Sequence, residues 1–186
     1  MRIDLFSIPI FIGDIDASKV IVKSKKFVRV PFSNIKTSYP EDCEVTMPNK
    51  SSQYLLKCIH ALLHECIQQK FTLALTSVWE NIYEKEDFQE SHIHPYHHFS
   101  FIVYKKIKQS RTAFFAPHRH LLESFYAGHY LCNVYKPNFI PECKQNQIIV
   151  FPSFLEHMVM KTSNAKTIAG NLRITGLSFK DTYKKL

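Results

Sequence analysis

The sequence predicts a mainly β protein, a β-sandwich or barrel, with a single helix in its N-terminal part. Short segments of apolar or alternating residues recur between polar turns, which is typical of such folds. Only one stretch shows the periodicity of an amphipathic helix. The chain of 186 residues also contains 15 Phe and 9 Tyr but only 4 Gly, a usage that favours strands. No linker rich in Gly or Ser divides the chain, so we expect one domain over residues 1–186.

The N-terminal half is expected to contain an edge strand, the helix and a long strand. Residues 3–12 are apolar but include Pro9, and proline is confined to edge strands because it cannot donate to a ladder. Residues 51–70 carry an apolar stripe at helical spacing. Residues 71–83 alternate as a strand, and its odd-numbered residues, Trp79 among them, are expected on one face.

The C-terminal half contains further strand signals. A polar turn after residue 83 leads into a histidine-rich strand that should stop or bulge at Pro95. The later segments with strand character are residues 99–107, 112–116, 129–135, 147–151 and 171–180.

The net charge of +8 has two interpretations. A lysine-rich surface keeps a protein soluble, whereas a basic patch can bind an acidic partner such as nucleic acid. Lysines cluster in residues 23–26, 105–108 and 184–185, but no cluster has zinc-finger or RNA-recognition spacing. The charge therefore permits a nucleic-acid partner without pointing to one.

The cysteines and the hydropathy pattern concern the compartment. The five cysteines are odd in number and include no Cys-x-x-Cys pair, which argues against a disulfide framework and a structural zinc site. No apolar run approaches the length of a membrane span, and the N-terminus lacks a signal-peptide pattern. We expect a cytoplasmic protein with reduced thiols and no membrane partner.

Four of the ten histidines lie between residues 92 and 98. Side chains at i and i+2 of an extended segment leave the same face, so His92 and His94 should point into one space. Two imidazoles in such a pair suit Fe, Zn, Cu or Ni, and a third ligand must come from elsewhere. The best candidate is His157, which follows an apolar run and the turn at Pro152. Glu90 is an alternative third ligand, because it shares the strand face by alternation.

An arginine further downstream suggests an anion site. Arg173 and Thr175 fall on one face of a strand, and the flanking residues Leu172, Ile174 and Leu177 are apolar. A guanidinium in a partly buried setting needs an anion, and its planar fork matches a carboxylate.

The order of these motifs resembles a family of 2-oxoglutarate and iron(II)-dependent oxygenases, the phage and bacterial type with a His-x-His-Pro motif. The residues that carry the resemblance are Trp79-x-Asn81, Gln89, His92-x-His94-Pro95, Ser100, Tyr104, Phe151-Pro152-Ser153, His157 and Arg173-x-Thr175, together with the opening Leu5-Phe6-Ser7-Ile8-Pro9-Ile10. The resemblance narrows the fold to a double-stranded β-helix (jelly roll, cupin-like) with the N-terminal helix packed on one sheet.

The resemblance also implies an activity and a site. It implies a dioxygenase that uses Fe(II), 2-oxoglutarate and dioxygen for a hydroxylase-type oxidation of an unknown substrate. His92, His94 and His157 would hold the metal, with His94 in the place where most related enzymes have a carboxylate. Arg173 would bind the distal carboxylate of 2-oxoglutarate, with Thr175, Tyr104 and Asn81 beside it.

Two other classes of function compete with this one. A jelly-roll module that binds a metal without turnover is favoured by the absence of the usual carboxylate. A basic nucleic-acid-binding protein with purely structural histidines is favoured by the net charge. No motif in the sequence identifies a substrate.

Overall fold

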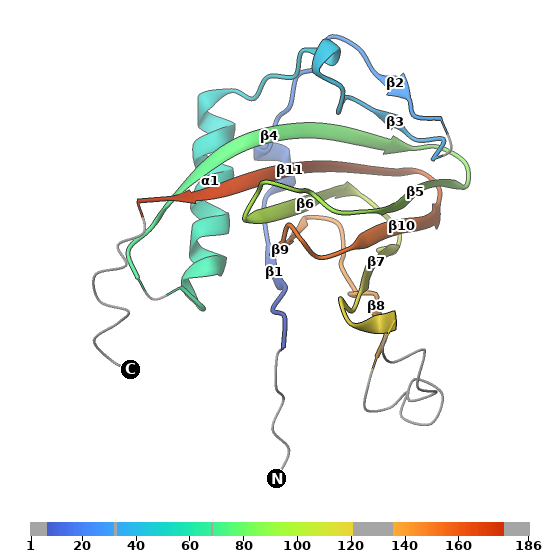
Figure 1. Ribbon diagram of the computed structural model, residues 1–186. Helices are drawn as coiled ribbons and strands as arrows, with labels where there is room; N and C mark the ends of the chain where they lie inside the picture. Colours follow the sequence, from blue (N-terminus) through green and yellow to red (C-terminus); the bar gives the residue numbers. More distant parts are fainter. Residues whose placement is uncertain (1–6, 32, 68, 121–135, 177–186) are drawn as a thin grey trace.

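The computed structural model describes residues 7–31, 33–67, 69–120 and 136–176. Two antiparallel sheets dominate it (Figure 1). The large sheet has the strand order β1 (Phe11–Asp14), β9 (Gln147–Pro152), β6 (Phe99–Lys106), β11 (Ala165–Thr175), β4 (Thr72–Tyr83), β3 (Lys36–Thr37), β2 (Val28–Arg29). The small sheet has the order β5 (Asp87–His92), β10 (His157–Thr162), β7 (Thr112–Phe115), β8 (Asn138–Phe139).

The large sheet buries both of its faces, and the alternation of its central strands shows why. In β6, Phe101 and Val103 pack toward the helix α1 (Asn49–His64), whereas Ile102 and Tyr104 pack toward the small sheet. The helix, the large sheet and the small sheet therefore form successive layers. This arrangement confirms the mainly β jelly roll with a helix packed on one sheet.

Helix α1 begins after Pro48 and presents Leu55, Ile59 and Leu63 to the large sheet, all fully buried. It ends at His64, six residues before the predicted end at residue 70. The backbone turns toward β4 there, although Ile67 still packs against the same apolar cluster. No helix in the described part of the chain is long and apolar enough to cross a membrane.

Strand β4 changes face along its length, which corrects the prediction that its odd-numbered residues share one face. Leu73 and Leu75 pack on the helix side together with Val78, whereas Trp79 packs on the small-sheet side. A β-bulge in the pairing with β11, next to Asn171, accounts for this change. Because a bulge inserts one residue, it moves every following side chain to the opposite face.

Other predicted strands differ in extent. The N-terminal edge strand is confined to β1, which begins at Phe11, and residues 3–6 lie outside the described part of the chain. Strand β11 begins at Ala165, six residues before the predicted start at 171. The predicted strand at residues 129–135 and the end of the one at 171–180 also fall outside the described residues. A short 3-10 helix, η1 (Ala17–Lys19), follows β1, and another, η2 (Glu41–Cys43), precedes α1.

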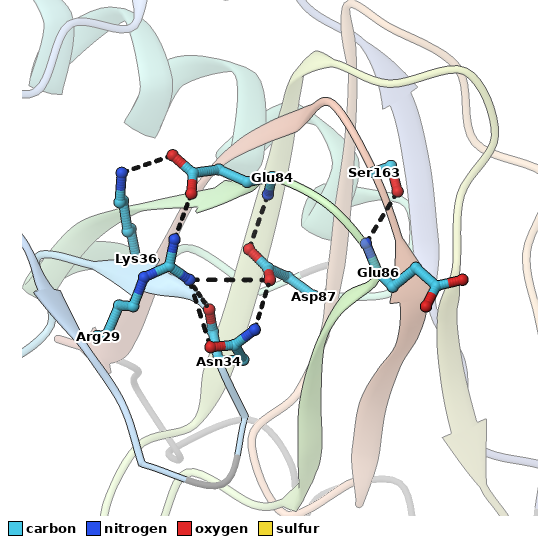
Figure 2. Close-up of polar contacts among 7 residues, drawn as sticks. All are labelled: Arg29, Asn34, Lys36, Glu84, Glu86, Asp87 and Ser163. Carbon is cyan, nitrogen blue, oxygen red and sulfur yellow. Dashed lines mark hydrogen bonds and ion pairs between the residues drawn. The ribbon is translucent and has the colours of Figure 1, made fainter.

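A polar network ties β2 and β3 to the turn between β4 and β5 (Figure 2). Asp87, which opens β5 and is 1% exposed, accepts hydrogen bonds from Glu84 N at 2.7 Å and Asn34 Nδ2 at 3.1 Å. Arg29 and Lys36 both pair with the Glu84 carboxylate. The network anchors the start of β5, whose far end carries His92.

Candidate metal centre and its pocket

Three imidazoles that are distant in the sequence meet between the sheets. His92 ends β5, His94 follows two residues later, and His157 opens β10 directly opposite His92 in the antiparallel ladder. One ring nitrogen from each residue can be chosen so that all three lie within 4.8 Å of one another. Three nitrogens this near to one another can converge on a single transition metal with small movements of the rings.

The protein fixes which nitrogen two of these rings offer. Nδ1 of His92 donates to the carbonyl of Glu90 at 2.6 Å, and Nδ1 of His157 donates to the carbonyl of Leu155 at 3.0 Å. In both rings Nε2 is therefore the nitrogen with a lone pair. Metal-binding histidines are commonly oriented by a carbonyl in this way.

Burial keeps the rings uncharged at neutral pH. Loss of solvation lowers the pKa of His157 to about 3 and that of His94 to about 4, and it also lowers the pKa of His92. The nearby imidazoles lower the first two values further. A metal therefore meets neutral ligands and has no proton to displace.

Aromatic rings surround the triad. Phe151 lies 4.7 Å from His157 between ring centroids, Phe114 lies 5.8 Å from it, and Trp79 lies 5.6 Å from His94. These contacts restrict the rings and exclude water from one side of the site. Such a site suits chemistry that must be shielded from solvent.

A pocket extends from the three histidines between the sheets. Its polar lining comprises Asn81, Tyr83, Gln89, Tyr104, Gln109, Ser110, Arg111, Thr112, Thr162 and Thr167. The Tyr104 hydroxyl lies 3.0 Å from Thr112 Oγ1 and 3.2 Å from Ser110 Oγ, so these hydroxyls form one buried group. Arg111, an exposed residue immediately before β7, is the one arginine among the described residues that line this pocket. The pocket thus combines a triad for a metal with hydroxyls and a cation for an anion.

Comparison with known proteins identifies the family. Residues 77–170, half of the chain, match a family model described as "Putative 2OG-Fe(II) oxygenase". The chain belongs to this oxygenase family. The matched residues include all three histidines and the pocket lining from Trp79 to Gly170, but they end before Arg173. No curated protein matches the oxygenase.

Solved structures share the fold of the oxygenase at low identity. HygX from Streptomyces hygroscopicus, with nickel, 2-oxoglutarate and hygromycin B bound, is 11% identical at a TM-score of 0.56, covering 92% of this chain and 83% of HygX. A 2OG-Fe(II) oxygenase from Burkholderia pseudomallei is 11% identical at 0.55, covering 85% and 76%. A prolyl hydroxylase from Trichoplax adhaerens is 12% identical at 0.52, covering 89% and 82%.

Two of the predicted cosubstrate residues lie outside the pocket of the oxygenase. Arg173 is exposed and donates from Nε to the carbonyl of Tyr96 at 3.1 Å, and Thr175 bonds with Thr72. Arg173 shares a face of β11 with Ala169, which lines the pocket, but four residues of strand separate them by about 13 Å. The structure thus places Arg173 and Thr175 outside the residues that line the pocket, whereas Tyr104 and Asn81 line it.

Glu90 also lies away from the metal centre. The pairing of β10 with β5 places Val159 opposite Gln89 and His157 opposite His92, so the four residues 89–92 of β5 face the three residues 157–159 of β10. This bulge puts Gln89 rather than Glu90 in the pocket, and the Glu90 side chain is exposed. Glu90 supports the site only through its carbonyl.

Two pocket residues, Gln89 and Arg111, had no role assigned to them from the sequence, although Gln89 is among the residues that carry the family resemblance. Gln89 lies between the Tyr83 hydroxyl, at 3.3 Å, and Nε2 of His92, at 3.4 Å. Arg111 follows a run of polar residues that is indistinguishable from a surface turn in the sequence. The signal that could have found Arg111 is its place immediately before a short apolar strand that faces the histidines.

Proposed function

We propose that His92, His94 and His157 hold Fe(II) and that the chain catalyses a 2-oxoglutarate-dependent, hydroxylase-type oxidation of a substrate not yet identified. The observation that carries the proposal is the convergence of three neutral imidazoles within 4.8 Å of one another. Imidazole nitrogens at this spacing, with two tautomers set by carbonyl groups, fit a divalent transition metal.

When bound, iron(II) supplies the activation of dioxygen and the oxidation of 2-oxoglutarate that such enzymes couple to substrate oxidation. The chain supplies orientation, charge and exclusion of water. Since all three ligands are neutral, they leave the full charge of the metal to attract an anionic cosubstrate. Phe151, Phe114 and Trp79 shield the histidines from solvent.

We assign Arg111, with Thr112 and Tyr104, to the distal carboxylate of 2-oxoglutarate. In the small sheet Phe114 lies opposite His157 and Thr112 lies opposite Val159. Two residues along a strand span about 7 Å, which is comparable with the length of a five-carbon diacid. A diacid whose oxo acid end lies at the histidines can therefore place its other carboxylate at these hydroxyls and the Arg111 guanidinium.

Anaerobic titration tests this proposal. Metal-free protein should bind one Fe(II) per chain, and only the iron-loaded protein should bind 2-oxoglutarate. Admission of dioxygen should then yield succinate. A protein that binds 2-oxoglutarate equally well without metal, or in which His157→Ala retains iron, would contradict the assignment.

A metal-binding module without turnover is the second candidate. It is favoured by the donor set, since the cluster found among the described residues contains three histidines and no carboxylate. Glu156, the acid next to His157, is paired with Arg119 and Ser91. The same titration separates the candidates, because a binding module would take up iron without producing succinate.

A nucleic-acid partner stays a prediction that depends on the net charge. In the lysine cluster at residues 23–26, Lys25 pairs with Glu44 and Lys26 with Asp42. These pairs neutralise two of the three lysines in that cluster. Steeply salt-dependent binding to DNA or RNA would be needed to support the idea.

A further inference from the structure

His94 differs from the other two histidines in what positions it. His92 is the last residue of β5 and His157 the first of β10, and each ring is held by a carbonyl. His94 lies beyond the end of β5, in the loop that leads to β6, and its ring packs on Trp79. The direction of this imidazole therefore depends on the loop of residues 93–98.

Hydrogen bonds join this loop to the turn between β9 and β10. The amide of His94 donates to the carbonyl of Ser153 at 2.9 Å. The amide of Ser153 donates in turn to the carbonyl of His98 at 3.1 Å. Both ends of the loop thus meet at Ser153, which is fully buried.

The far side of the loop is tied to β11 and β4. The His98 amide donates to the carbonyl of Leu172 at 3.0 Å, and the Ile174 amide donates to Nδ1 of His98 at 2.8 Å. The His97 Nδ1 lies 2.9 Å from the hydroxyl of Thr76. His97 and His98, the two histidines that follow His94, therefore stabilise the loop through these hydrogen bonds.

Arg173 completes the attachment at the tip of the loop. Tyr96 occupies the left-handed region, with φ of 69°, although it is not a glycine. Such a conformation persists where the surroundings hold it. The carbonyl of Tyr96 accepts the hydrogen bond from Arg173 Nε, so the guanidinium holds the strained residue against β11.

We propose that Arg173 is a positioning residue for the third metal ligand, acting through Tyr96 and the loop on His94. The inference rests on the proposed function, since it takes His94 as a ligand. Arg173 has no contact with the pocket in this role. It holds a loop whose backbone, rather than a strand, determines where an imidazole points.

Loss of Arg173 should weaken metal binding without abolishing it. His92 and His157 keep their own carbonyl partners, so two ligands stay in place. Removing a group that orients a ligand typically lowers metal affinity by about 10- to 100-fold. We expect a loss of about tenfold for Arg173→Ala, and a smaller loss for Arg173→Lys, whose ammonium can still donate to the Tyr96 carbonyl.

The test is a cobalt(II) titration of metal-free protein, followed by visible absorption. Wild type, Arg173→Ala, Arg173→Lys, His94→Ala and the Arg173→Ala/His94→Ala double variant are compared. Arg29→Ala is the matched control, because it removes another exposed, hydrogen-bonded arginine that lies in the network of Figure 2. Thermal unfolding of each variant shows whether affinity merely follows stability.

We expect Arg173→Ala to lose affinity in the wild-type background and to have no further effect once His94 is absent. Arg29→Ala should retain wild-type affinity whatever its melting temperature. Wild-type affinity in Arg173→Ala, or an equal loss with and without His94, overturns the positioning role alone. Failure of wild type to bind cobalt, or unchanged affinity in His94→Ala, overturns the proposed function and this inference with it.

Discussion

His157 lies directly opposite His92 in the antiparallel ladder of β5 and β10, with their ring centroids 4.3 Å apart. The small sheet therefore brings a residue near the C-terminal end of the chain to the histidine-rich segment. Because the ladder sets the register, the backbone pairing itself brings the two imidazoles to this separation. The site is preorganised for a cation.

His157→Ala should abolish tight metal binding. The ring is 3% exposed and is one of only three nitrogen ligands in the described site, so its loss leaves two. We expect iron(II) or cobalt(II) affinity to fall at least about 100-fold, more than for loss of an orienting group. Isothermal titration would measure this. His64→Ala, on the exposed face of α1, is the control and should retain full affinity.

Acid should destabilise the metal-free protein through the buried histidines. Their pKa values of about 3 for His157 and about 4 for His94 compare with about 6.5 in an unfolded chain. Below about pH 6.5 the unfolded state therefore binds more protons than the folded state. The free energy of unfolding should be highest above this pH and should fall as the pH drops toward about 4.

Urea unfolding at a series of pH values would measure this dependence. His157→Gln removes one of the titrating groups and should show a shallower fall. Saturating metal should raise the free energy of unfolding by a nearly constant amount between about pH 4 and pH 6.5, because it binds imidazoles that are already neutral in the folded state. Identical slopes for wild type and His157→Gln would show that the buried rings do not control acid stability.

The sequence was sufficient to predict that the three histidines converge, but it did not predict which residues lie beside them. His92 and His94 follow from the alternation of an extended segment, and His157 follows from an apolar run that ends in a turn. The bulge between Gln89 and His92 has no such pattern, since it arises from pairing with β10. Alternation alone therefore placed Glu90 rather than Gln89 beside the metal centre.

Arg173 shows the same limit for the anion site. Its apolar neighbours indicated a partly buried strand, and β11 does place Leu172 in the core. The distance along the strand from the pocket to Arg173 depends on where β11 begins, which is six residues earlier than expected. The alternation of apolar residues predicts which face of a strand a side chain lies on. The pairing of the strands in three dimensions determines which residues that side chain contacts.

Arg111→Ala should weaken the binding of 2-oxoglutarate to the metal-loaded protein. A hydrogen-bonded ion pair with a carboxylate is worth about 1.5–3 kcal/mol, which is about 10- to 150-fold in affinity. Arg111→Lys should lose less, because it keeps the charge but not the planar fork. Arg173→Ala at saturating metal is the comparison. If Arg173→Ala lost affinity for 2-oxoglutarate and Arg111→Ala did not, Arg173 and not Arg111 would bind the distal carboxylate.

Gly170→Ala should destabilise the fold beside the pocket. A Cβ at this position of β11 would lie 2.5 Å from the carbonyl oxygen of Ser77 and 2.6 Å from Phe101 Cζ. Neither the ladder backbone nor a buried ring can move without cost, so we expect roughly 1–3 kcal/mol lower stability in urea unfolding. Gly13→Ala is the matched control. The Cβ added at Gly13 would meet the flexible end of the Leu62 side chain, so a smaller loss of stability is expected there. Equal losses in the two variants would show that the backbone clash at Gly170 is unimportant.

Asp87→Ala should destabilise the junction that carries β5 (Figure 2). The carboxylate is buried and accepts bonds from the Glu84 amide and the Asn34 side chain, so its removal leaves both donors without this partner. The exposed guanidinium of Arg29, 3.8 Å away, adds only a weak ion pair. We expect a loss of roughly 3 kcal/mol, dominated by the buried donors.

Urea unfolding of Asp87→Ala and Lys36→Ala would separate burial from charge in this network. Lys36 pairs with Glu84 at 2.5 Å, but both side chains are about two-fifths exposed, and such surface pairs contribute at most about 1 kcal/mol. If the two variants lose equal stability, the network is held by its surface charges. A much larger loss for Asp87→Ala assigns its strength to the buried carboxylate, whose strand ends in His92.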